Sequence, residues 1–122
     1  MQESLLPECT GPRWKVGNPE RVALALVAIV DNLRAAAQAT PGDAQAWQLL
    51  SLTVRHADDT RREVDSPELD EGHITGFALD LHALVTACMH MPDAAPEAGD
   101  YLRAVLARSP ELFQALGVTP GH

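Results

Sequence analysis

The chain has 122 residues, of which 46% are apolar and 21% are charged, and 17 acidic residues against 9 basic ones give a formal net charge of −8. This length fits one domain, and the apolar fraction suffices for a hydrophobic core without disulfides or metal ions. The negative charge argues against binding nucleic acid or an anionic membrane surface, because both need clustered Lys and Arg. We therefore expect a protein partner with a neutral or basic surface.

Residues 1–17 are predicted to form an irregular N-terminal arm, because prolines and glycines interrupt them and no helical period is visible. The arm is more apolar than a typical disordered tail. Its apolar residues are Leu5, Leu6, Trp14 and Val16. We expect the arm to pack on a surface, either that of its own domain or that of a partner.

The sequence predicts a cytoplasmic protein. Its first residues have neither the basic region nor the apolar stretch of a signal peptide. The longest apolar run, residues 22–30, is nine residues long, whereas a membrane span needs about 20. The two cysteines, Cys9 and Cys88, form no metal-binding spacing and are expected to stay reduced.

Two helices are predicted in the first half of the chain. Asn18 is a suitable N-cap, Pro19 suits the first helical position, and the helix should run to residue 39, before a Thr-Pro-Gly sequence. Asp43 is predicted to cap the second helix, which should continue to about Arg62.

The second half repeats a signal in which a capping residue precedes proline. One copy, at residues 66–68, predicts a third helix whose firm part begins near His73 and which Pro92 ends. Asp93 and Pro96 should open a fourth helix, and the second copy, at residues 109–111, predicts a short fifth one. The predicted fold is all-α. It is a single helical domain over residues 18–122, with four main helices and a short C-terminal fifth.

The first predicted helix has apolar residues on two sides. At about 100° per residue, Val22, Leu26, Ile29 and Leu33 form one stripe suited to a core. Leu24 and Val27 fall on the opposite side, next to Asp31. Either the domain surrounds this helix completely, which we favour slightly for a five-helix domain, or the second face meets another chain.

No phosphate-binding loop, zinc-protease motif, nucleophile elbow or calcium loop occurs in the sequence. Incomplete sets of metal ligands do occur, His56 with Asp59 and Glu63, and Asp70 with His73, but each is better explained as a polar surface. We therefore expect no catalytic residue, no cofactor and no metal ligand.

Seven acidic residues lie between positions 58 and 71. They are Asp58, Asp59, Glu63, Asp65, Glu68, Asp70 and Glu71. The simpler interpretation is a solvated helix end and loop, because charged runs are usually surface. The functional alternative is an acidic patch that docks a basic partner.

Together these features favour a small, non-catalytic regulatory protein that binds and inhibits or sequesters a protein partner. In size and character the chain is similar to small helical bacterial antiactivators of transcription factors, inhibitors and immunity proteins. The predicted interface residues, shared by a partner or a homodimer, are Trp14, Leu24, Val27 and Asp31. The alternative is an enzyme or small-molecule binder with a pocket between helices, in which His56, His73 or His82 acts as acid or base.

Overall fold

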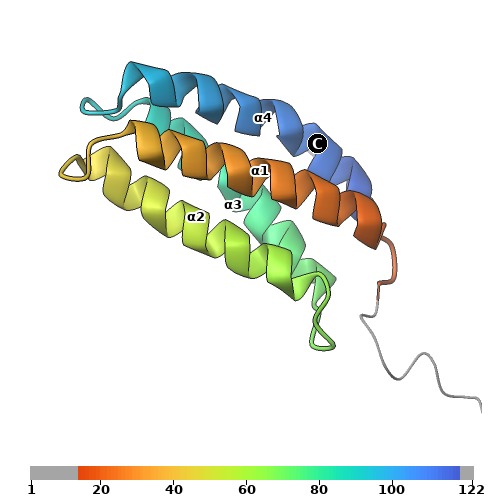
Figure 1. Cartoon of the computed structure of the whole chain (residues 1–122). Helices are drawn as coiled ribbons and strands as arrows, with labels where there is room; N and C mark the ends of the chain where they lie inside the picture. The colour runs from red at the N-terminus through yellow and green to blue at the C-terminus, as the bar shows by residue number, and fades with distance from the viewer. Residues whose placement is uncertain (1–13, 119–122) are drawn as a thin grey trace, which may run out of the picture.

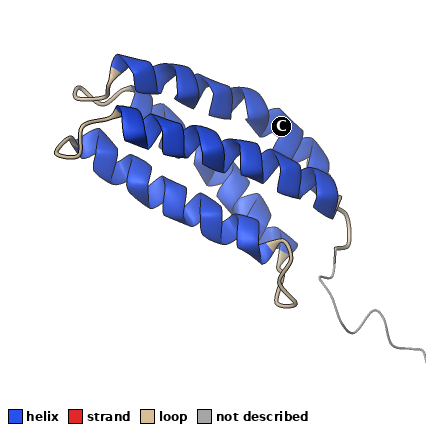
Figure 2. Cartoon of the chain, in the orientation of Figure 1, coloured by secondary structure: helices blue, strands red, loops and turns tan. Residues whose placement is uncertain are grey.

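Four helices follow one another along residues 14–118, the part of the chain that the computed structural model describes, and no strand occurs there (Figures 1 and 2). They are α1 (Pro19–Ala39), α2 (Gln45–Glu63), α3 (Glu71–Met89) and α4 (Pro96–Leu116). The prediction of an all-α bundle is confirmed. Most of the predicted arm, residues 1–13 with Leu5, Leu6 and Cys9, lies outside the described residues, as do residues 119–122.

The helices form a four-helix bundle in which α1 packs between α2 and α4 (Figure 1). Helix α3 closes the other side by packing against the same two helices, so α1 and α3 lie diagonally opposite each other. Within the described part of the chain, no helix covers the side of α1 that points away from α3.

The core consists of the stripe predicted on α1 and matching stripes on the other helices. Val22, Leu26, Ile29 and Leu33 are all fully buried. They meet large buried side chains from the other three helices: Leu50, Ile74, Leu81, Val85, Leu102, Val105 and Leu112. Each fully buried aliphatic side chain contributes about 1.5–3 kcal/mol of hydrophobic free energy, which makes this cluster the main source of stability.

The predicted fifth helix does not exist as a separate element, because α4 continues through Pro110 to Leu116. Proline removes one helical hydrogen bond, but Pro110 lies on the exposed side of α4. On the buried side, Leu112 and Leu116 extend the stripe begun by Leu102 and Val105. Continuous packing of this stripe against the bundle outweighs the local signal for a break.

The predicted cap of α2 is also wrong. Asp43 makes no capping hydrogen bond, and the N-cap position is taken by Ala44. The carboxylate of Asp93, from the loop between α3 and α4, instead accepts hydrogen bonds from the backbone N–H groups of Gln45 and Ala46, at 2.6 and 3.3 Å. This contact between the α3–α4 loop and the first turn of α2 replaces a local cap.

Helix α3 begins later than the Ser-Pro-Glu signal and slightly earlier than its predicted firm part. The Ser66 hydroxyl accepts a hydrogen bond from the N–H of Glu68 and shapes the loop. Asp70 is the N-cap, and its side chain accepts from the N–H of Gly72 at 2.9 Å.

Helix α1 is also the one described helix that is long and apolar enough to cross a membrane. The core helix of a soluble bundle has the same composition, and the apolar stripe of α1 is buried against α2 and α4. Its other sides carry Glu20, Arg21, Asp31 and Arg34, all of them exposed. We therefore describe α1 as a core helix of the bundle.

Candidate protein-binding face

Leu24 and Val27 are exposed to solvent on the open side of α1. Their exposed fractions are 72% and 42%, whereas Leu26, only two residues from Leu24, is fully buried. The arrangement that we slightly favoured from the sequence, a first helix surrounded by its own domain, is therefore wrong. Among the described residues, α2 and α4 are the only helices that contact α1, and the predicted fifth helix is part of α4.

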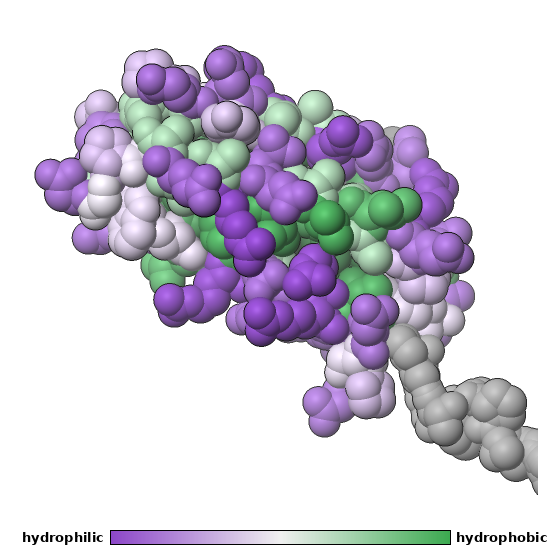
Figure 3. All heavy atoms as spheres, in the orientation of Figure 1, coloured by the Kyte–Doolittle hydropathy of each residue, from purple (hydrophilic) through white to green (hydrophobic). Residues whose placement is uncertain are grey.

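The open side of α1 has a regular composition, which we call the outer stripe. Its members are exposed and alternate at spacings of four and three residues: Glu20, Leu24, Val27, Asp31, Arg34 and Gln38. This spacing keeps side chains on one side of a helix and is the spacing used for contact between helices. Figure 3 shows apolar surface gathered over α1 and bordered by polar residues.

Two shallow hollows flank the outer stripe, one on each side of α1. The hollow of about 320 Å³ between α1 and α2 is lined by Ala37, Val54 and the partly exposed ring of Trp47, with Arg34 at its edge. The hollow of about 390 Å³ between α1 and α4 is lined by Leu24, Ala25, Arg21, Arg108 and Glu111. Both are open to solvent and place apolar walls next to charged side chains.

Trp14, a predicted interface residue, packs against the core of its own domain. Its indole nitrogen is buried and has no hydrogen-bond partner within the described residues. The residues after it are held against the C-terminal end of α4. The N–H of Asn18 donates to the carbonyl of Ala115 at 2.7 Å, and Val16 lies against Gly117, whose φ of 75° ends α4. Of the two alternatives for the arm, residues 14–17 follow the first.

Glu71 holds this segment through its carboxylate. The oxygens accept hydrogen bonds from the backbone N–H groups of Lys15, Val16 and Gly17, at 2.5, 3.2 and 2.8 Å. Burial raises the pKa of Glu71, but these three hydrogen bonds and the Lys15 charge outweigh burial, so the pKa lies below its ordinary value. Glu71 is therefore part of the fold rather than a free docking charge.

Asp58 is likewise bound within the domain. It is nearly buried, and its carboxylate contacts the guanidinium groups of Arg61, Arg62 and Arg34, at 3.1, 2.8 and 3.7 Å. The hydrogen bond from Arg61 is the strongest influence on its pKa. With the charges of Arg62 and Arg34, it lowers that pKa although burial acts in the opposite direction. This cluster links α1 to α2.

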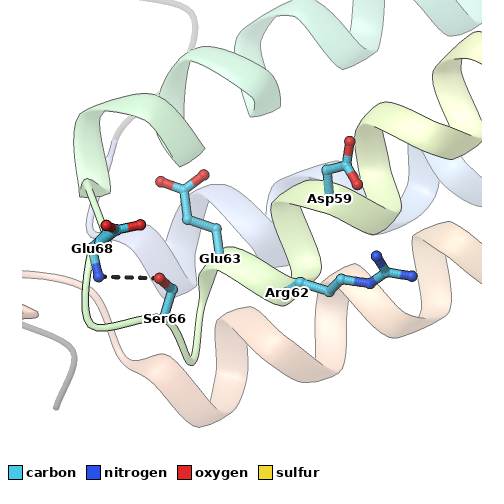
Figure 4. Close-up of a pocket in the computed structure, with 5 residues that line it drawn as sticks. All are labelled: Asp59, Arg62, Glu63, Ser66 and Glu68. Carbon is cyan, nitrogen blue, oxygen red and sulfur yellow. Dashed lines mark hydrogen bonds between the residues drawn. The ribbon is translucent and has the colours of Figure 1, made fainter.

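Two more of the seven acids have structural partners. Glu63 contacts Nδ1 of His73 at 2.6 Å and accepts a hydrogen bond from the N–H of Asp70, while Asp70 caps α3. In Figure 4, Asp59 and Glu63 point to one side of α2 and Arg62 to the other, around an open hollow of about 360 Å³. The acids with exposed side chains and no such partner among residues 14–118 are Asp59, Asp65 and Glu68. Fewer of the seven acids are therefore exposed and unpaired than the sequence indicates.

The histidines that could have supported acid–base chemistry lie on the surface. His56 packs edge-on against Phe77, with ring centroids 4.9 Å apart, and His73 is paired with Glu63. His82 is exposed, and none of the three lines any of the five described hollows. Within residues 14–118, no three His, Cys, Asp or Glu side chains are grouped to hold a metal ion.

Cys88 is fully buried in the core. Burial in apolar surroundings raises the pKa of its thiol to about 11, so the thiol stays protonated at neutral pH. This side chain acts as a small apolar residue.

Comparison with protein-family models, curated proteins and solved structures found no match for this chain. Function is therefore argued from the geometry of the face just described.

The structure places three of the four predicted interface residues, Leu24, Val27 and Asp31, on one face of α1 and leaves Trp14 elsewhere. Sequence reasoning missed the hollow that contains Trp47. A signal for it existed, because Trp47 lies about 60° around the helix from Leu50, at the margin of the apolar stripe of α2. The sequence signal did not show which neighbouring helix would leave this margin of α2 uncovered.

Proposed function

We propose that this chain is a small, non-catalytic regulatory protein that acts by covering a surface of a protein partner. The observation that carries the proposal is the outer stripe of α1, in which the large apolar side chains of Leu24 and Val27 are exposed to solvent. Large exposed apolar side chains grouped on one face are typical of interaction sites.

The composition of the face supports contact with a protein. Aliphatic side chains at the centre of the stripe are surrounded by charges of both signs, Glu20, Arg21, Asp31 and Arg34. An apolar centre with a polar margin is the usual anatomy of a protein interface. The nearby Trp47 ring adds an aromatic side chain, a residue type that is enriched at such interfaces.

The mechanism we propose is steric. A partner whose own active or DNA-binding surface is occupied by this face would be inhibited or sequestered without any chemical step. The exposed acids Asp59, Asp65 and Glu68, together with the net charge of −8, favour a partner surface that is neutral or basic.

Site-specific photo-crosslinking in cells of the source organism tests this proposal. A photoreactive phenylalanine derivative replaces Leu24 in one variant and Leu79 in a control, because Leu79 is also exposed, at 55%, but lies on α3. We expect Leu24 to crosslink to a defined protein, identified by mass spectrometry, and Leu79 to give at most a weak background. Equal crosslinking at the two positions, or none at Leu24, would overturn the proposal.

A further inference from the structure

The charges on the open side of α1 are arranged so that its two ends complement each other. Glu20 lies near the beginning of the outer stripe and Arg21 lies beside it, at the margin that borders α4, while Asp31 and Arg34 lie toward the end of the helix. A second α1 lying parallel would place each charge next to an identical one, which is unfavourable. An antiparallel copy places Arg21 opposite Asp31 and Glu20 opposite Arg34.

These two pairings require nearly the same alignment. The midpoint between positions 21 and 31 is residue 26, and the midpoint between positions 20 and 34 is residue 27. One twofold axis near these residues therefore satisfies both pairs, each of them twice. The apolar side chains Leu24 and Val27 then lie next to that axis, where they cover each other.

We propose that the outer stripe of α1 binds a second copy of this chain, with the two α1 helices antiparallel about a twofold axis near residues 26 and 27. The inference rests on the proposed function because both assign protein contact to this face, and a second copy that covers Leu24 and Val27 competes there with a different partner. Symmetry supports it, because a face with one apolar centre and complementary ends is used twice in a twofold dimer.

The groups that this dimer needs are available on the surface. Within residues 14–118, neither Arg21 nor Asp31 forms an ion pair. Arg34 reaches Asp58 only at 3.7 Å, and 52% of its side chain is exposed. The local pairs also offset the general repulsion between two chains that each carry a charge of −8.

Charge exchange between positions 21 and 31 tests this geometry. Sedimentation equilibrium is measured on the full chain, on the single variants Arg21→Glu and Asp31→Arg, and on the double variant that carries both changes. We expect the wild type to dimerise and each single variant to raise the dimer Kd about 10-fold or more, because two attractive pairs become repulsive. The double variant should return to within about threefold of wild type.

Mixing the two single variants provides a second measurement. In the antiparallel arrangement, Glu at position 21 of one chain meets Arg at position 31 of the other, and the original Asp31 meets the original Arg21. We therefore expect the mixture to form a heterodimer with an affinity near that of the wild type. Circular dichroism is used as a control to check that every variant is folded.

Two outcomes would overturn the inference. One is a wild-type chain that stays monomeric up to concentrations of about 100 µM. The other is a dimer whose Kd is insensitive to the single changes or is not restored by the double one. If Leu24 crosslinks to a different protein while the chain is monomeric, the proposed function stands and the dimer does not. A crosslink from Leu24 only to a second copy of the chain supports the dimer and removes the proposed function, and the absence of any crosslink at Leu24 counts against both.

Discussion

Glu71 shows how a single side chain can hold a segment that has no regular structure. Its carboxylate accepts hydrogen bonds from three successive backbone N–H groups, those of residues 15–17, and thereby joins this segment to the first turn of α3. An ionised carboxylate is a strong acceptor for such backbone N–H groups. The acid predicted as a docking charge is in fact a tether.

The pH dependence of stability should report this tether. Because the pKa of Glu71 is lower in the folded chain than its ordinary value of 4.5, its ionisation stabilises the fold above pH 4.5, and this contribution is lost as the pH falls through the lower, folded pKa. We expect Glu71→Gln to lower the free energy of unfolding at pH 7 by about 1 kcal/mol, a value discounted for solvent exposure. The difference from wild type should shrink at pH 3.5, as measured by urea denaturation.

The matched control is Glu68→Gln, since Glu68 lies only three residues earlier and its side chain is exposed. This variant should leave the stability at both pH values within about 0.5 kcal/mol of wild type. An equal loss for Glu71→Gln at pH 7 and pH 3.5 would show that its charge is not what holds residues 15–17.

At the scale of the element, the start of α2 depends on a residue from a different loop. Asp93 binds two of the free N–H groups of that helix, whereas Asp43, directly before the helix in sequence, binds none. We expect Asp93→Ala to lower the free energy of unfolding by about 1 kcal/mol, the usual cost of losing a cap, and Asp43→Ala to change it by less than about 0.5 kcal/mol. Thermal unfolding followed by circular dichroism measures both. A larger loss of stability for Asp43→Ala than for Asp93→Ala would show that Asp43 caps α2, as the sequence predicts.

Pro110 should be a weak point within α4. It has no N–H to donate to the carbonyl four residues earlier, yet the helix continues through it. Replacing Pro110 with Ala restores that hydrogen bond, and we expect a gain of about 1–3 kcal/mol in the free energy of unfolding. Pro96→Ala is the control, because at the first position of α4 the missing N–H has no helical partner in any case. A loss of stability in Pro110→Ala would mean that the backbone geometry that proline imposes is needed for packing against α1.

At the scale of the whole molecule, the number of helices around α1 decides which of its two apolar faces is core. Leu26→Ala should lower the free energy of unfolding by about 2–5 kcal/mol, because Leu26 is fully buried. Leu24→Ala should cost less than about 1 kcal/mol in dilute solution, with a larger cost at high protein concentration, where the dimer adds to the stability of the wild type. A loss for Leu24→Ala that equals that of Leu26→Ala and does not change with protein concentration would place Leu24 in the core.

Apart from the short fifth helix, which proved to be the end of α4, the all-α class, the core stripe of α1 and the approximate bounds of α1, α2 and α3 could be predicted from the sequence. These features depend on residues near each other in the chain, such as the Asn18 cap and the periodic spacing of Val22, Leu26, Ile29 and Leu33. Local hydrogen bonding and helical periodicity act over a few residues, so they can be recognised without the fold.

Other features were decided only by tertiary structure, because they depend on residues that are far apart in sequence. Asp93 replaced Asp43 as a cap since two loops meet at one end of the bundle, and α4 passed through Pro110 since its buried stripe packs continuously against α1. Four of the seven acids predicted as a patch have partners within the domain. Whether Leu24 and Val27 are covered depends on how many helices surround α1. The periodic pattern within one helix does not contain that number.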